Sequence, residues 1–93
     1  MSLEALVSMY IDSAEKVLSE MTHTKSSVTV GEADVDKTVE YVRAYLADAK
    51  YYKAQKRFET SLTSVAYCEG LLDALRLLGL VKFQWPAKRE NEK

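Results

Sequence analysis

The sequence has few of the residues that crosslink a chain or interrupt a helix. Among 93 residues there are one cysteine, one proline and three glycines. The single cysteine, Cys68, excludes a disulfide bond within the chain, and its apolar surroundings predict a small buried side chain. Because Pro86 is the only proline, the chain before it can form long uninterrupted helices. We expect a reducing, cytoplasmic setting for such a chain.

Long apolar runs and an excess of one charge are also missing. No apolar stretch approaches the about 20 residues that a membrane-spanning helix needs. Glu4 and Asp12 interrupt the N-terminal region, so we expect no secretory signal. The net charge of −1 provides no general attraction to nucleic acid or to an anionic membrane. The lone histidine, His23, has no metal-binding or nucleophilic partners nearby, so we expect an exposed loop residue, no metal and no cofactor.

The first part of the chain has the pattern of a one-sided amphipathic helix. Apolar residues recur at alternating steps of three and four positions over residues 3–21, and acidic and hydroxyl side chains fall opposite them. Ser2 is the expected N-cap. Residues 23–27 are polar and break the pattern, so the helix is expected to end before them.

A second helix is predicted to run to about Ala54. Thr29 and Glu32 have the spacing of a capping box, and Asp34 is an alternative cap. Apolar residues line one side of this helix, and beside them runs a stripe of tyrosines with one carboxylate. The stripe consists of Tyr41, Tyr45, Asp48 and Tyr52. The short turn at residues 55–57 implies that this helix and the next form an antiparallel hairpin.

The third helix is predicted to begin at Phe58 and to stop at Gly79, and the fold is organised around it. It is apolar on several sides, which predicts that neighbours enclose it. A further stripe holds small residues, namely Thr63, Ala66, Gly70 and Ala74. Glycine inside a helix costs about 0.5–1 kcal/mol relative to alanine. We therefore expect Gly70 to permit close approach of another helix backbone.

These patterns predict one all-α domain over residues 1–86, a three-helix up-and-down bundle whose second and third helices form the hairpin. After Gly79, Val81, Phe83 and Trp85 alternate with polar residues, which predicts a short extended C-terminal tail. A single strand has no sheet to join, so this tail should fold back over the bundle or reach a second subunit. Residues 87–93 are predicted to form a mobile charged tail.

Two segments carry a family resemblance. One is ADAKYY at residues 47–52, and the other combines Gly70 with LDA at residues 72–74 and LGL at residues 78–80. Together they resemble a short archaeal family known as domain of unknown function 357, over residues 39–80. The resemblance implies a three-helix up-and-down bundle and implies no activity. The chain departs from the family pattern at Lys56, where glycine is common, and at Glu69 and Leu71, where histidine and tryptophan are common.

Three carboxylates are the sharpest candidates for chemistry. Glu69 and Asp73 lie one turn apart on the third helix, and Asp48 on the second helix joins them if the two faces meet. Such a cluster could bind Mg²⁺ and hold a phosphate-bearing substrate, as in a nucleotide or phosphate-ester hydrolase. The favoured alternative is solvated carboxylates in surface salt bridges, and another is a structural pair of Asp73 with Arg76 or Tyr45.

A basic cluster marks the tip of the predicted hairpin. Its candidate anion-binding residues are Lys50, Lys53, Lys56 and Arg57. Because acidic residues nearly balance the basic ones in the whole chain, solvated side chains are the simpler interpretation and RNA binding is the less favoured one.

Taken together, the patterns favour a non-enzymatic interaction or scaffold module over an enzyme. The second half of the third helix and the tail are expected to form the interface of a homodimer, or of a complex with another protein. The predicted interface residues are Gly70, Leu71, Ala74, Leu78, Phe83 and Trp85. The alternatives are the metal-dependent hydrolase and a weakly RNA-binding accessory protein.

Overall fold

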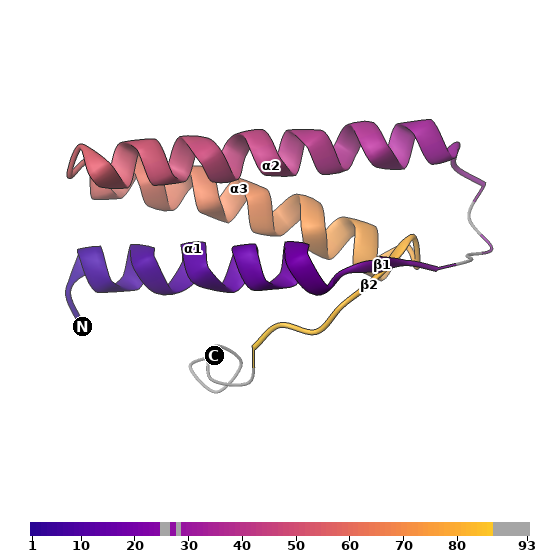
Figure 1. The fold of residues 1–93 in the computed structure, drawn as a ribbon, viewed down its shortest axis with the longest axis horizontal. Coiled ribbons are helices and arrows are strands. Elements are labelled where there is room, and N and C mark those ends of the chain that lie inside the picture. The colour runs from indigo at the N-terminus through magenta and orange to yellow at the C-terminus, as the bar shows by residue number, and fades with distance from the viewer. Residues whose placement is uncertain (25–26, 28, 87–93) are drawn as a thin grey trace.

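The computed structural model describes residues 1–24, 27 and 29–86, which form a three-helix bundle (Figure 1). The elements, in order, are α1 (Leu3–Glu20), β1 (Thr22–His23), α2 (Glu32–Ala54), α3 (Phe58–Leu77) and β2 (Val81–Lys82). The predicted all-α fold is confirmed. The segment predicted to be a mobile tail, residues 87–93, lies outside the described residues.

The first helix has the predicted one-sided character. The Ser2 hydroxyl accepts a hydrogen bond from the Ala5 amide at 3.0 Å, which satisfies one of the free amides at the helix start. Val7, Ala14 and Val17 lie almost fully buried on the inner side of α1. The chain turns to an extended conformation at Met21, where the helix ends.

The N-cap of the second helix is a residue that the sequence patterns did not single out. Gly31 is its N-cap, without a side-chain capping bond, and the Gly31 carbonyl accepts hydrogen bonds from the Asp34 and Val35 amides. Both predicted caps, Thr29 and Asp34, are therefore wrong. Glu32 and Asp34 lie instead in the first turn, where their charges favour the positive end of the helix dipole.

Helices α2 and α3 form the predicted antiparallel hairpin and make the most extensive contact in the fold (Figure 1). The turn between them places Lys56 in the left-handed region, with φ of 61°. The buried hydroxyl of Ser61 donates a hydrogen bond to the Ala49 carbonyl of α2, so these two residues lie level along the hairpin. Helix α1 packs against both and closes the bundle.

The third helix ends as predicted. Gly79 has φ of 75°, the left-handed conformation that glycine adopts at low cost. The Gly79 amide donates to the Arg76 carbonyl and the Leu80 amide donates to the Leu75 carbonyl, each at 3.0 Å. This pair of bonds is the Schellman arrangement, which satisfies carbonyls left free at a helix end.

After Gly79 the chain folds back along the bundle, and residues 80–86 are called the C-terminal strap below. Strand β2 pairs antiparallel with β1, with Thr22 opposite Lys82 and His23 opposite Val81. The expectation that the extended segment has no sheet to join is therefore wrong. The exposed His23, expected in a loop, belongs to β1.

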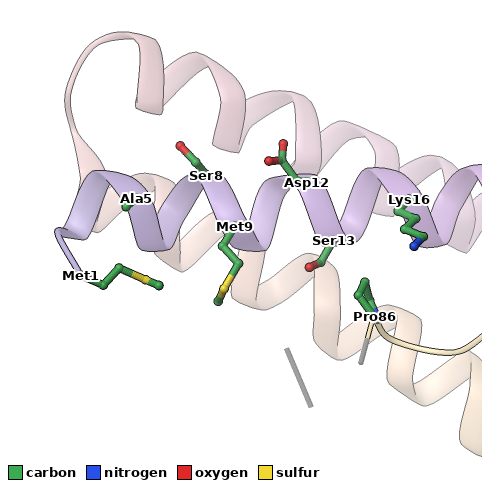
Figure 2. Close-up of a pocket in the computed structure, with 8 residues that line it drawn as sticks. All are labelled: Met1, Ala5, Ser8, Met9, Asp12, Ser13, Lys16 and Pro86. Carbon is green, nitrogen blue, oxygen red and sulfur yellow. The ribbon is translucent and has the colours of Figure 1, made fainter. Parts of the chain in front are cut away.

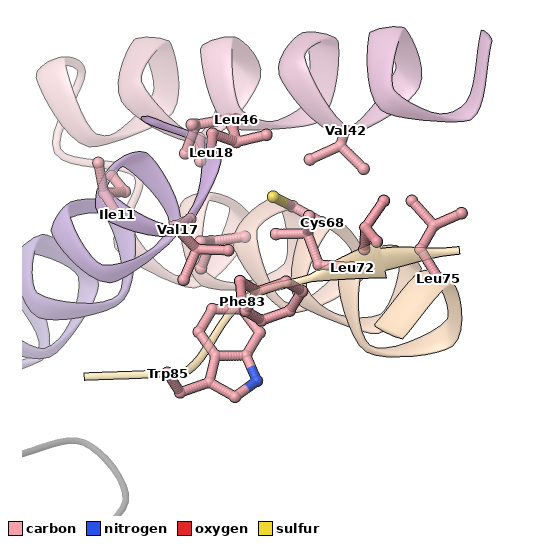
Figure 3. Packing of buried hydrophobic residues seen from close by; sticks show 14 of the residues in the cluster. Ile11, Val17, Leu18, Val42, Leu46, Cys68, Leu72, Leu75, Phe83 and Trp85 are labelled. Atoms are coloured by element: carbon pink, nitrogen blue, oxygen red, sulfur yellow. The ribbon is translucent and has the colours of Figure 1, made fainter. Parts of the chain in front are cut away.

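The strap completes the core. Of the two predicted outcomes, folding back over the bundle or reaching a second subunit, the structure has the first. Phe83 and Trp85 are 8% and 4% exposed, and their rings meet edge to face with centroids 5.0 Å apart. Figure 3 shows both rings on the side of the core away from α2. One continuous core unites all three helices and the strap. Its buried members from the helices include Val7, Ile11, Val17, Val42, Leu46, Val65, Cys68, Leu72 and Leu75.

Candidate interaction surface

The structure does not bring the three candidate carboxylates together. Asp48 adjoins Ala49, which is level with Ser61, whereas Glu69 and Asp73 lie about 12 Å and 18 Å further along α3. Asp48 is also exposed, whereas the other two are partly buried. Among the described residues, no group of three histidine, cysteine or acidic side chains could hold a metal ion.

Asp73 has a structural role instead. Its Oδ1 atom accepts a hydrogen bond from the Trp85 indole nitrogen at 2.7 Å and lies 3.6 Å from the Arg76 guanidinium. Arg76 in turn lies over the Phe83 ring, 5.6 Å from its centroid. The predicted pairing of Asp73 with Arg76 is confirmed, and the bond to Trp85 shows that this carboxylate holds the C-terminal strap on α3.

Acidic and aromatic side chains lie among the basic residues at the hairpin tip. Lys50 pairs with Glu15 of α1, and the Arg57 guanidinium lies 4.9 Å from the centre of the Tyr52 ring. The shallow depression beside Lys50, Lys53 and Lys56 is also lined by acidic residues. These are Glu4, Asp12 and Glu15. Mixed charge of this kind does not make an anion-binding surface.

A hollow of about 530 Å³ lies along α1, beside Pro86 (Figure 2). Its lining is mainly apolar and includes Met1 and Met9. The ionisable side chains in the lining are Asp12 and Lys16, both exposed. The hollow therefore lacks the desolvated acid–base groups of an active site.

The predicted interface residues divide into two groups. Phe83 and Trp85 are buried within their own chain and offer no surface to a partner. Gly70, Ala74 and Leu78 are exposed, and Leu71 is half-buried. Apart from its two chain neighbours and the backbone of its own helix, a Cβ atom built at Gly70 meets no atom within 4 Å. The expectation that Gly70 permits close packing inside the fold is therefore wrong, and α3 is open along one side.

We call this side the open face of α3. Its members are Thr63, Ala66, Tyr67, Gly70, Ala74, Leu77 and Leu78, all exposed and none charged. They recur at helical spacing over about 22 Å of the helix. Tyr67 and Leu77 are 54% and 79% exposed, which is high for large apolar side chains. The Thr63 hydroxyl donates to the Glu59 carbonyl of its own helix, so the face presents little unmet polarity.

The apolar surface continues onto α2. The Tyr45 ring lies against the Tyr67 ring, with centroids 4.4 Å apart and planes tilted by 35°. Tyr41, one turn away on α2, is 53% exposed. The two helices therefore present one apolar surface in which tyrosine rings bridge the groove between them.

A known family model covers most of the chain. Residues 9–81 match the model of a family described as "Protein of unknown function (DUF357)". The chain belongs to the DUF357 family. No curated protein and no solved structure matches the chain. The DUF357 match contains the whole open face, whereas Phe83 and Trp85 of the strap lie beyond it. Within the described part of this DUF357 chain, no helix has the length and apolarity needed to cross a membrane.

The sequence analysis did not predict six residues of this surface as interface residues, namely Tyr41, Tyr45, Thr63, Ala66, Tyr67 and Leu77. A usable signal was present, because the side of α3 from Thr63 to Leu78 carries no charge. A solvent-facing side of a helix normally carries charged residues. The apolar residues on the other sides of α3 obscured that signal.

Proposed function

We propose that this protein is a non-enzymatic interaction module that associates with a second copy of itself through the open face of α3. The observation that carries the proposal is the exposed, charge-free surface formed by that face together with Tyr41 and Tyr45 of α2. Exposed apolar patches of this kind are typical of protein–protein contact sites.

The energetics of Gly70 support a contact outside the monomer. Glycine in a helix interior costs about 0.5–1 kcal/mol relative to alanine. Gly70 does not have a positive φ, and nothing within its own chain lies near enough to require the missing side chain. Close approach of a second backbone would offset this cost, because a Cβ atom at the centre of the face would separate the two surfaces.

The net charge of the chain and the area that an interface of ordinary extent would bury suit a weak homodimer. One tenth of the 6015 Å² accessible surface from each copy would bury about 1,200 Å² in total, at the low end for specific interfaces. The net charge of −1 produces little repulsion between copies. We therefore expect a reversible dimer with a dissociation constant in the micromolar range.

We further propose a cytoplasmic location in an archaeal cell, the origin that the family resemblance implies. The completely buried thiol of Cys68 is compatible with a reducing compartment. The hydrolase alternative is not retained, because the carboxylates are separated along the hairpin. RNA binding is not retained either, because acidic side chains lie among the basic cluster.

Sedimentation velocity from about 1 µM to about 1 mM tests the proposal. We expect the wild-type sedimentation coefficient to rise with concentration from the monomer to the dimer value. Gly70→Glu introduces a charge into the centre of the face without a clash in the monomer, so it should remain monomeric with an unchanged circular dichroism spectrum. Ala47→Glu, on an exposed part of α2 outside the face, is the matched control and should behave as wild type. A wild-type protein that stays monomeric over the whole range refutes self-association.

A further inference from the structure

We infer that the two copies pair antiparallel about a two-fold axis beside Gly70, with Lys37 of each copy against Asp48 of the other. This inference rests on the proposed self-association and adds the orientation of the partner and the residues that select it.

The first argument comes from the positions of the charges on α2. Lys37, Tyr41, Tyr45 and Asp48 follow one another at steps of four, four and three residues, so they lie along one side of the helix. Lys37 and Asp48 are exposed, and neither has an ion-pair partner within the part of the chain that the structure describes. The two charges are opposite in sign, about 16 Å apart, and their midpoint lies between the tyrosines.

The second argument comes from α3 and leads to within about 4 Å of Gly70. The midpoint lies about 4 Å from Tyr45 towards the N-terminal end of α2. Tyr45 is stacked on Tyr67, and α3 runs antiparallel to α2. Because Ala49 lies level with Ser61, the midpoint lies level with Tyr67 and Cys68, about 4 Å along α3 from Gly70.

A two-fold axis at this level relates each face to itself. Gly70 meets its own copy, so the helices can approach closely at the centre. Ala66 and Ala74 are each four residues from Gly70 and exchange places under the axis. Thr63 and Leu77, each seven residues away, do the same and place a smaller side chain opposite a larger one. The arrangement is isologous, as most dimer interfaces are.

Charge selects this orientation over the parallel one. When two α2 helices lie antiparallel about the midpoint, each Lys37 lies level with the partner's Asp48, which makes two contacts of opposite sign. In a parallel pair, each residue lies level with the same residue of the partner, so Lys37 lies level with Lys37 and Asp48 with Asp48, and like charges face each other. Complementary charges at the edge of an interface fix register and orientation, while the apolar centre supplies most of the affinity.

Charge reversal tests the orientation. Lys37→Glu and Asp48→Lys each convert two attractive contacts into repulsive ones, so each should raise the dimer dissociation constant about tenfold at low salt. The double variant, Lys37→Glu with Asp48→Lys, should restore the constant to within about threefold of wild type, because the pairs are re-formed with signs exchanged. About 1 M salt should remove most of the difference. Lys16→Glu, an equal change of charge on exposed α1, is the control and should have no comparable effect.

Zero-length carbodiimide coupling gives a second measurement, because it joins an amine to a carboxylate only when they touch. We expect a covalent dimer linked through Lys37 and Asp48, and its loss in Lys37→Gln. If Gly70→Glu abolishes the dimer while both charge reversals leave its affinity unchanged, self-association stands and the antiparallel geometry is refuted. If the wild-type protein never dimerises, the proposed function fails together with the inference.

Discussion

The bond between Trp85 and Asp73 should be measurable as a coupling energy in protein stability. Trp85→Phe retains an aromatic ring in the strap but removes the indole N–H, and Asp73→Ala removes the acceptor. Each variant also loses other interactions, such as the contact of Asp73 with Arg76. A double-mutant cycle cancels these losses and isolates the pair.

The expected magnitude follows from burial. A hydrogen bond to a charged group contributes about 1.5–3 kcal/mol. The Asp73 side chain is 38% exposed, so its carboxylate can hydrogen-bond to water when Trp85 is replaced. The contribution of the bond should therefore fall at or below the lower end of that range. We expect a coupling of about 1–1.5 kcal/mol. Domains of this size are stable by roughly 5–14 kcal/mol, so the two-state transition should remain measurable in all variants.

Urea unfolding followed by circular dichroism near 222 nm is the appropriate assay. Trp85 is the only tryptophan, so its fluorescence is lost in half of the cycle. All four proteins should carry Gly70→Glu, which prevents association from contributing to stability. Gln84→Ala, an exposed neighbour on the strap, is the control and should change stability by less than about 0.5 kcal/mol. If the stability changes of the two single variants add up to that of the double variant within about 0.3 kcal/mol, Asp73 does not hold the strap.

Two backbone predictions follow from the same structure. Gly70→Ala should raise the free energy of unfolding of the monomer by about 0.5–1 kcal/mol, because alanine favours the helix and its methyl group meets nothing; a loss of stability would mean that a neighbour occupies this space. Lys56→Gly should also raise the free energy of unfolding, by about 0.5–1 kcal/mol, because glycine relieves the left-handed strain at φ of 61°. Thermal unfolding measures the change, and the control Lys53→Gly should be destabilising because Lys53 lies inside α2. A lower stability of Lys56→Gly than of wild type would contradict the prediction.

The features that the sequence predicted correctly depend on local interactions. Ser2 caps α1 through an amide three residues away, and Gly79 ends α3 through bonds that span three to five residues. The hairpin follows from a turn too short to allow any other path. In each case the residues that decide the structure are neighbours in the chain.

The incorrect predictions concern contacts between distant segments. The apolar sides of α3 do not show which of them the strap covers, so Gly70 was assigned to the wrong environment. Asp48, Glu69 and Asp73 share helical spacing, but their separation depends on the register of the hairpin, which the Ser61–Ala49 bond reveals. The strands β1 and β2 are two residues each and nearly sixty positions apart, too short to leave a pattern.

The start of α2 shows a third kind of error. Gly31 caps the helix with its carbonyl alone and offers no side chain that a motif could match. Two better-looking candidates, Thr29 and Asp34, lie on either side of it. Capping motifs therefore located the beginning of this helix only to within a few residues.

The C-terminal strap also has a consequence for how the chain folds as it is made. The Thr24 hydroxyl bonds to the Gly79 carbonyl, and Trp85 covers the core from the last part of the described chain. On a translating ribosome, all three helices emerge before this ring does. One apolar side of the nascent bundle therefore stays exposed until the Trp85 indole packs against it.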